Sequence, residues 1–418
     1  FITDLWFIVT GTHFVKMKMS AQWRRYNIYM VFILVSFAVM YLFAHLLHPG
    51  KLRPALRVSK EDHGRFVKMW TSTSNKFAFQ NKIKGGLKQI LYWTNFFGIL
   101  PEEYVKQQHE CNCPYKCQLT ADRSLLESSD AILFHLYDTW AETWVLNTTK
   151  VVPFPNYRSP SQVWVMANME PLGNLWGNFE IFNGLFNWTM TYRADSTILL
   201  PYSYVHKLNT EQNVSKQTAN YYRQKTKTAV GRISNCKDYA GRYQLVNQIL
   251  RYLDVDLFGK CYGSLCGSNS KDPFDKKCDN ILKEYRFYLA FENSFCKDYV
   301  TEKYWLSLRR GQVPIVNWKH VNLKLVIPNS YINVYDFPDI ESFGHYIKLV
   351  NSNETLYNGY FEWKHKYTHA SSCISCITCH ALHENAGMAQ VFTDFAGWMH
   401  NDFCEDANDI KLRLKNVD

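Results

Sequence analysis

A glutamate and a lysine, Glu302 and Lys303, stand together where a helix is predicted to begin. Residues 285–291 are aromatic and apolar, as in an interior strand, and residues 301–310 have the pattern of a helix that Gly311 ends. The positive end of the helix dipole favours the glutamate there and disfavours the lysine by roughly a few tenths of a kcal/mol. A bound phosphate removes that cost, because the free backbone N–H groups and the ammonium can bind the same anion. The pair therefore indicates a phosphorylated ligand.

Glu170 is a candidate general base, because it follows the predicted strand 161–166 in a loop. Most loop glutamates are solvated surface residues, and that interpretation competes with the catalytic one. An ordinary carboxyl group, with a pKa of about 4.3, is already ionised in a mildly acidic compartment and can accept a proton there.

The elements that position these side chains alternate along the chain. After strand 285–291 and helix 301–310, residues 313–316 predict another strand, which completes a parallel strand–helix–strand unit. Residues 89–94 and 131–135 predict earlier strands of the same kind. Ligands of such sheets bind beyond the carboxyl ends of the strands. The pattern predicts an α/β protein with two Rossmann-like domains.

Several separated motifs stand out along the chain: Phe291-Glu-Asn-Ser, Asp298-Tyr-Val-Thr-Glu-Lys, Phe186-Asn-Trp-Thr, Tyr192-Arg-Ala-Asp-Ser and Ser234-Asn235. Together they resemble the motifs of the α1,3-fucosyltransferases that use GDP-fucose. The resemblance runs from about residue 111 to residue 404, with the motifs in the family's order. It implies a GT-B architecture, in which two facing Rossmann-like domains bind the acceptor (first domain) and the nucleotide (second domain).

The resemblance also implies roles for single residues. Glu170 matches the family's catalytic base, Glu302 a glutamate that binds fucose hydroxyls, and Lys303 and Arg242 the residues that bind the pyrophosphate. Further matches to the donor site are Asn293, Tyr299, Ser234 and Asn235. From the residues alone, Arg242 could instead be a surface arginine of a helix, Asn293 a helix cap, and Glu292 a structural residue.

These roles imply an inverting glycosyltransferase that moves L-fucose from GDP-β-L-fucose to O3 of a GlcNAc residue in glycoprotein glycans. Residues 167–173 depart from the vertebrate Lewis-antigen pattern, and the cysteine set is more similar to that of invertebrate enzymes. The innermost GlcNAc of N-glycans is therefore the favoured acceptor, with outer-chain LacNAc or LacdiNAc as the alternative. An inactive Golgi glycan-binding relative is an alternative of a different class, which the intact functional residues argue against.

The formal net charge of +10 fits a membrane surface or an anionic substrate. The basic residues are dispersed, so nucleic acid is not an expected partner. No metal ion should be required, because two cationic side chains and a helix N-terminus can offset the leaving-group charge; manganese is expected at most to stimulate. Asp254-Val-Asp256 matches a metal-binding motif of other glycosyltransferases, but the alternation over residues 253–258 predicts a strand with outward carboxylates.

Residues 28–47 are predominantly apolar over about the length that spans a bilayer, which predicts a single transmembrane anchor. A secretory signal peptide is the alternative, although the stretch exceeds a typical signal h-region and no small-residue cleavage site follows it cleanly. All 12 cysteines follow this stretch, and so do four glycosylation sequons, at Asn147, Asn187, Asn213 and Asn353. The large C-terminal part should be lumenal, and the family resemblance implies a single-pass type II protein of the Golgi membrane.

The expected organisation follows in chain order. Residues 1–27 form a cytoplasmic tail, of which the first 16 need not be native, because Met17 or Met19 would make a conventional start. The anchor spans 28–47 and a stem 48–84. An acceptor-side domain spans 85–208, a linker 209–227, a GDP-fucose-binding domain 228–366 and a cysteine-rich tail 367–418.

The tail contains Cys373-Ile-Ser-Cys376-Ile-Thr-Cys379-His380, which matches a zinc cluster or a c-type haem attachment site. An oxidising lumen favours disulfides instead. The family resemblance implies that the tail is tied back to Cys111, Cys113 or Cys117, clamping the two domains across a long loop with a typical gain of about 2–4 kcal/mol. The other disulfide candidates, whose connectivity stays open, are Cys236, Cys261, Cys266, Cys278, Cys296 and Cys404.

Overall fold

The computed structural model describes residues 5–9, 13–17, 86–108, 113–139, 154–171, 179–208, 219–236, 238, 240–264, 266, 275–384, 391–400 and 404–405. Strands β1 (Leu5–Val9) and β2 (His13–Met17) form an antiparallel hairpin in a unit of their own, Phe1–Ala55. The predicted anchor and stem lie outside the described residues. Among the residues that are described, no helix is both long enough and apolar enough to cross a bilayer.

Everything else belongs to the unit Leu56–Asp418, which contains two parallel sheets. The first sheet has the order β4-β3-β5-β6-β7-β8, and every pairing in it is parallel. Its strands are β3 (Lys88–Tyr92), β4 (Cys117–Thr120), β5 (Ala131–His135), β6 (Val163–Asn168), β7 (Trp188–Thr191) and β8 (Ile198–Leu199). Helix α3 (Pro101–Gln108) connects β3 to β4. Strands β5 and β6 are buried along their whole length, as expected of parallel strands covered on both faces.

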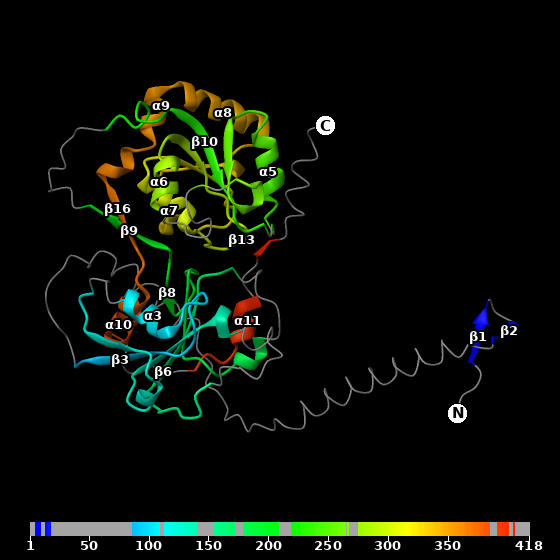
Figure 1. The fold of residues 1–418 in the computed structure, drawn as a ribbon, viewed down its shortest axis with the longest axis vertical. Coiled ribbons are helices and arrows are strands. Elements are labelled where there is room, and N and C mark those ends of the chain that lie inside the picture. Colours follow the sequence, from blue (N-terminus) through cyan, green and yellow to red (C-terminus); the bar gives the residue numbers. More distant parts are fainter. Residues whose placement is uncertain are drawn as a thin grey trace. The chain divides into compact units, whose positions relative to one another are not determined.

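The second sheet has the order β11-β10-β12-β14-β15, again with only parallel pairings. Its strands are β10 (Lys227–Arg232), β11 (Val255–Phe258), β12 (Tyr285–Leu289), β14 (Val313–Val316) and β15 (Ile332–Asn333). Helices α5 (Arg242–Ile249), α8 (Ile340–Ser352) and α9 (Glu354–Gly359) pack on one face, while α6 (Lys276–Leu282) and α7 (Glu302–Arg309) pack on the other (Figure 1). The predicted α/β fold with two parallel sheets is confirmed.

The chain leaves the first sheet and returns to it through one pair of strands. Strand β9 (Ser203–Lys207) runs out, β16 (Tyr367–Ser371) runs back, and the two pair antiparallel along their full length (Figure 1). Two short strands, β13 (Phe295–Cys296) and β17 (Cys404–Glu405), form a further antiparallel pair. We call the described parts of 86–208 and 372–400 the N-terminal lobe, and those of 219–366 the C-terminal lobe.

The residues after β16 complete the N-terminal lobe instead of forming a separate tail. Helix α10 (Ile374–Glu384) packs its apolar side chains into the core on one face of the first sheet, beside Ile90 and Leu133. Helix α11 (Phe395–His400) packs into the core on the other face, beside Leu91 and Phe134. Each face of the sheet therefore owes part of its apolar cover to the end of the chain.

The disulfides follow this arrangement. Cys113–Cys376 and Cys117–Cys379 tie α10 back to the segment around β4, which confirms the tie that the family resemblance implied. Because α10 itself packs in the N-terminal lobe, the expected clamp between two domains is wrong. The remaining described bonds are Cys236–Cys261, Cys266–Cys278 and Cys296–Cys404, and Cys373 is also oxidised. The zinc and haem interpretations of this motif are excluded, because its cysteine sulfurs are in disulfides. Cys111 lies outside the described residues.

The sequons differ in their surroundings. Asn187 is buried, and its Oδ1 accepts hydrogen bonds from Trp164 N at 2.7 Å and from the Arg158 guanidinium. A glycan on that side chain has no room in this fold, so the prediction at Asn187 is wrong. Asn353 is exposed and caps α9, with its Oδ1 accepting from Leu356 N. Asn147 and Asn213 lie outside the described residues.

Candidate active site

A cavity of about 230 Å³ opens where the strand order of the second sheet reverses. Strands β11 and β12 flank β10, so the connections on the two sides of β10 turn in opposite directions and leave a crevice beyond the carboxyl ends. The cavity is lined by Glu170, Tyr202, Arg232, Ile233, Ser234, Asn235, Arg242, Tyr288, Asn293, Tyr299, Glu302, Lys303, Leu306 and Arg310. Both lobes contribute to it, the N-terminal lobe through Glu170 and Tyr202.

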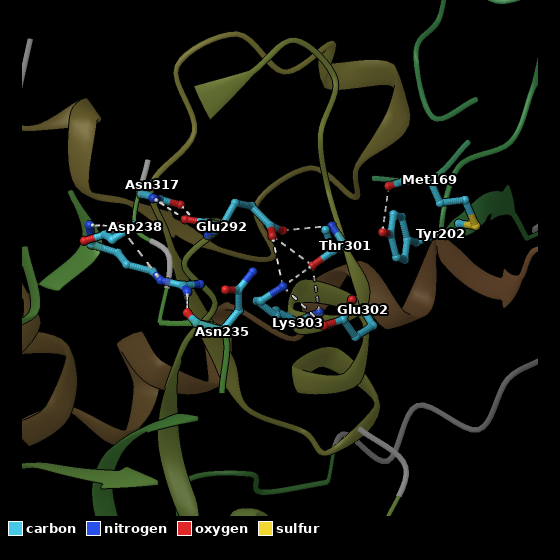
Figure 2. Close-up of polar contacts among 10 residues, drawn as sticks. Met169, Tyr202, Asn235, Asp238, Glu292, Thr301, Glu302, Lys303 and Asn317 are labelled. Atoms are coloured by element: carbon cyan, nitrogen blue, oxygen red, sulfur yellow. Dashed lines mark hydrogen bonds and ion pairs between the residues drawn. The ribbon is translucent and has the colours of Figure 1, made fainter. Parts of the chain in front are cut away.

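Glu292 organises the start of helix α7 at this cavity. Its buried carboxylate accepts hydrogen bonds from Thr301 N at 2.8 Å and from Thr301 Oγ1 at 2.9 Å, while Glu292 N donates to Asn317 Oδ1 (Figure 2). Thr301 is the N-cap of α7. Burial raises the pKa of Glu292 even though Lys303 and the Thr301 donors oppose it. The structural role left open for Glu292 in the sequence is the one its contacts support.

Lys303 is held by two carboxylates of its own chain. Its Nζ lies 3.2 Å from Glu292 Oε2 and 3.2 Å from Glu302 Oε1, and it donates to Thr301 Oγ1 at 2.8 Å (Figure 2). Burial acts to lower the pKa of Lys303, but these two carboxylates prevail and raise it. Burial likewise acts to raise the pKa of Glu302, and Lys303 prevails and lowers it. The lysine at the helix start thus has internal counter-charges, so its presence alone does not require a bound phosphate.

Arg242 opens helix α5 on the other side of the crevice and is buried, so it is not a surface arginine. Asp238 accepts hydrogen bonds from Arg242 N at 2.9 Å and from Tyr243 N at 3.0 Å, and lies 3.9 Å from Arg242 Nε. Arg242 Nη2 donates to the carbonyl oxygen of Asn235, which also lines the cavity. A cationic side chain is therefore fixed at the same crevice as Lys303.

Glu170 enters the cavity just after β6. The Asn168 side chain braces its backbone, with Nδ2 donating to Glu170 O at 2.6 Å. Tyr202 donates its hydroxyl to Met169 O at 2.9 Å (Figure 2), and its ring lies 6.3 Å from that of the buried Tyr299. Burial, and then the carboxylates of Glu170, Glu302 and Glu292, raise the pKa of Tyr202. The base candidate Glu170 and the two carboxylates that contact Lys303 therefore act on one tyrosine.

Comparisons with known proteins agree with this geometry. The family model "Fucosyltransferase, N-terminal" matches residues 85–203, and "Glycosyltransferase family 10 (fucosyltransferase) C-term" matches residues 222–398. Alpha-(1,3)-fucosyltransferase C of Drosophila melanogaster is 33% identical over 347 residues, which cover 75% of this chain and 78% of the relative. The chain belongs to glycosyltransferase family 10, the fucosyltransferases.

Other relatives of this fucosyltransferase are similar over comparable lengths. Glycoprotein 3-alpha-L-fucosyltransferase A of Drosophila melanogaster is 32% identical and covers 76% of this chain and 61% of the relative. Alpha-(1,3)-fucosyltransferase fut-6 of Caenorhabditis elegans is 30% identical, with 75% and 80% covered. A crystal structure of an α1,3-fucosyltransferase with GDP-fucose is 16% identical, with a TM-score of 0.45 and 79% and 97% covered. The enzyme class predicted from the sequence is confirmed.

The cavity of this fucosyltransferase brings together every donor-site and base residue singled out in the sequence. Those residues are Glu170, Ser234, Asn235, Arg242, Asn293, Tyr299, Glu302 and Lys303. Asn293 is buried there and, among the described contacts, caps no helix. By contrast, Asp256 is exposed on the edge strand β11, accepts a hydrogen bond from Tyr285 and does not line the cavity. The predicted outward orientation of that carboxylate is confirmed.

Several residues that line the cavity or support its walls were not found from the sequence. Leu306 and Arg310 lie four and eight residues after Glu302, so the helical period could have placed them on the same face. Asp238 lies four residues before Arg242, where an acidic residue ahead of a helix is a recognisable capping signal. No local pattern indicated Tyr202. It lies immediately before β9, whose position depends on pairing with the distant strand β16.

Proposed function

We propose that the enzyme transfers L-fucose from GDP-β-L-fucose to O3 of a GlcNAc residue in glycoprotein glycans, with inversion at the fucose C1. The observation that carries this proposal is that one cavity is lined by Glu170 from the N-terminal lobe and by Arg242, Glu302 and Lys303 from the C-terminal lobe. A carboxylate base thus lies in the same cavity as an anion-binding group. The names of the relatives support the transferred sugar and the linkage.

The C-terminal lobe would bind the donor. Lys303 in the first turn of α7 and Arg242 in the first turn of α5 are both cationic groups at helix N-termini, and together they suit a pyrophosphate. As the bond between C1 and the phosphate oxygen lengthens, negative charge grows on GDP and these groups stabilise it. Glu302, whose pKa is lowered beside Lys303, stays ionised and can accept hydrogen bonds from fucose hydroxyls.

Glu170 would remove the proton from the attacking hydroxyl. The GlcNAc O3 forms the new bond to C1, the C1–O bond to GDP breaks, and the proton passes to the Glu170 carboxylate. A single displacement on a β-linked donor gives an α-linked product. Arg242, Lys303 and the N-termini of α5 and α7 supply the positive charge that this step requires, so the proposal includes no required metal ion.

The favoured acceptor is the innermost GlcNAc of N-glycans, with outer-chain LacNAc or LacdiNAc as the alternative. The Drosophila relative named as a glycoprotein fucosyltransferase supports a glycoprotein acceptor without selecting between them. The proposal also places the enzyme in the Golgi membrane with its catalytic part in the lumen. The disulfides support an oxidising compartment.

The test is the variant Glu170→Gln, assayed with GDP-fucose against a panel of defined glycans. Loss of a general base should lower kcat about 10²- to 10⁴-fold while GDP binds with unchanged affinity. Glu103→Gln, an exposed glutamate on α3, is the matched control and should transfer at the normal rate. Normal transfer by Glu170→Gln would refute the assigned base. GDP binding without transfer by the unaltered enzyme to any glycan would favour the inactive glycan-binding alternative.

A further inference from the structure

A second pocket lies on the N-terminal lobe, away from the donor residues. Its volume is about 510 Å³, and its wall is formed by residues that directly follow β3 and β4, including Trp93, Asn95, Asp122 and Arg123, together with Glu102 at the start of α3. We call it the α3 pocket. None of the residues to which the mechanism assigns a role lines it.

The α3 pocket and Glu170 share one edge of the first sheet. All strands of that sheet are parallel, and Glu170 follows β6 while the pocket residues follow β3 and β4. The order β4-β3-β5-β6 separates β3 from β6 by two strand spacings, or roughly 10 Å. A glycan of a few sugar units is long enough to reach from one to the other.

An exposed aromatic ring stands at the strand between them. Phe97 is 46% exposed, and its ring packs 4.3 Å from that of His135, the last residue of β5. Its backbone is left-handed, with φ of 53°, a conformation that costs roughly 1–3 kcal/mol for a side chain of this kind. Strained backbone of this kind gathers at functional sites, and the strain at Phe97 therefore points to a binding role for its ring.

A buried pair of residues holds that loop in place. The His135 ring nitrogen Nδ1 lies 2.7 Å from Asp138 Oδ2, and Asp138 Oδ1 accepts a hydrogen bond from Gly98 N at 3.2 Å. Both side chains are largely buried. The loop that carries Phe97 is therefore fixed to the carboxyl end of β5 before any ligand arrives.

The chemistry of the α3 pocket suits a neutral sugar. The Arg123 guanidinium stacks 4.4 Å from the centre of the Trp93 ring and donates to Trp93 O at 3.0 Å. The carboxylates Glu102 and Asp122 line the same pocket as this one guanidinium, so the charged side chains of the wall do not favour an anion and can serve as planar hydrogen-bonding groups. The lining combines apolar side chains, among them Trp93, Leu100 and Pro101, with placed polar groups, as small-ligand sites do.

We propose that Phe97 and the α3 pocket form an extended acceptor subsite, which binds neutral sugar units of the glycan beyond the GlcNAc that reacts. This inference rests on the proposed function. Phe97 acts as a stacking platform at the end of β5, and the pocket receives the next units at the ends of β3 and β4. The subsite makes the enzyme prefer long acceptors over the reacting unit alone.

The test compares two acceptors with the full chain: a glycopeptide carrying a neutral biantennary N-glycan, and the disaccharide from that glycan that contains the reacting GlcNAc. Phe97→Ala should lower kcat/KM for the glycopeptide about tenfold, mainly through KM, and leave the disaccharide unchanged. Glu102→Ala tests the pocket itself and should lower the glycopeptide value about threefold. Leu349→Ala, 53% exposed on α8, is the matched control and should change neither value.

Each other outcome has a distinct meaning. Equal losses on both acceptors, or no loss on either, would overturn the subsite. Absence of transfer to both acceptors by the unaltered enzyme would count against the proposed acceptor chemistry instead. The melting temperature of each variant is measured alongside, and a folded Phe97→Ala variant with the unaltered ratio between the two acceptors overturns the inference.

Discussion

The positive charge of Lys303 is balanced from inside the chain. Its residue type and position at a helix start were evident from the sequence, and so was Glu302 beside it. The partner that the sequence could not assign is Glu292, because only the loop between β12 and α7 brings that carboxylate to 3.2 Å from the ammonium. Motifs thus identified residues that line the cavity, whereas the contacts among those residues could be assigned only from the fold.

At the residue scale, we predict that Glu292→Gln lowers the free energy of unfolding by about 1–3 kcal/mol, because Thr301 and Lys303 each lose a buried charged acceptor. Urea denaturation measures the change. Glu284→Gln is the control, since Glu284 forms an exposed ion pair with Lys227 and should change stability by less than about 0.5 kcal/mol. Similar losses in both variants would contradict the anchoring role of Glu292.

At the scale of elements, apolar runs predicted strands well and predicted α7 within one residue at each end. Residues 131–135 are β5 as predicted, and the strand predicted at 161–166 is β6, two residues later. The family resemblance tied the tail to Cys113 or Cys117, but the packing of α10 against the first sheet was not predicted, because its neighbours there lie on β3 and β8, far earlier in the chain. Local pattern carries no information about such a contact.

The paired strands β9 and β16 lead to a prediction about pH. His369 on β16 lies near Trp305 and 3.2 Å from Ser203 Oγ. Burial, and then the positive charges of Lys364, Arg309 and His206, lower the pKa of His369 below its ordinary value. Between that lowered pKa and about 6.5 the unfolded chain holds more protons, so stability falls as the pH falls.

His369→Gln should therefore lose less stability than the unaltered enzyme between pH 7 and pH 5. Thermal unfolding followed by circular dichroism at several pH values measures the difference. His345→Gln, an exposed histidine of α8, is the control and should follow the unaltered enzyme. If His369→Gln loses as much stability on acidification as that control does, the histidine is not responsible.

At the scale of the whole molecule, the sequence predicted two parallel sheets and an oxidised cysteine set. It could not show that Cys113–Cys376 and Cys117–Cys379 close loops spanning 263 and 262 residues of sequence within one lobe. Either bond keeps essentially the same loop closed. Their contributions to stability should therefore not be additive.

We predict this non-additivity in a background that carries Cys373→Ser, so that no third bond of α10 contributes. Replacing either the Cys113–Cys376 pair or the Cys117–Cys379 pair by serine should lower the free energy of unfolding by less than about 1.5 kcal/mol. Replacing both pairs should lower it by about 2–5 kcal/mol, and by more than the sum of the two separate losses. Guanidinium denaturation under non-reducing conditions measures all three variants. Simple additivity would show that each bond acts locally.

The return of the chain through β16 also affects the order in which the two lobes can fold. Helices α10 and α11 cover parts of both faces of the first sheet, yet they leave the ribosome after the whole C-terminal lobe. The C-terminal lobe can fold as soon as it is synthesised, whereas the first sheet must wait with part of its apolar surface uncovered. Of the two lobes, the N-terminal one is synthesised first, yet its apolar cover is complete only after the C-terminal lobe has been made.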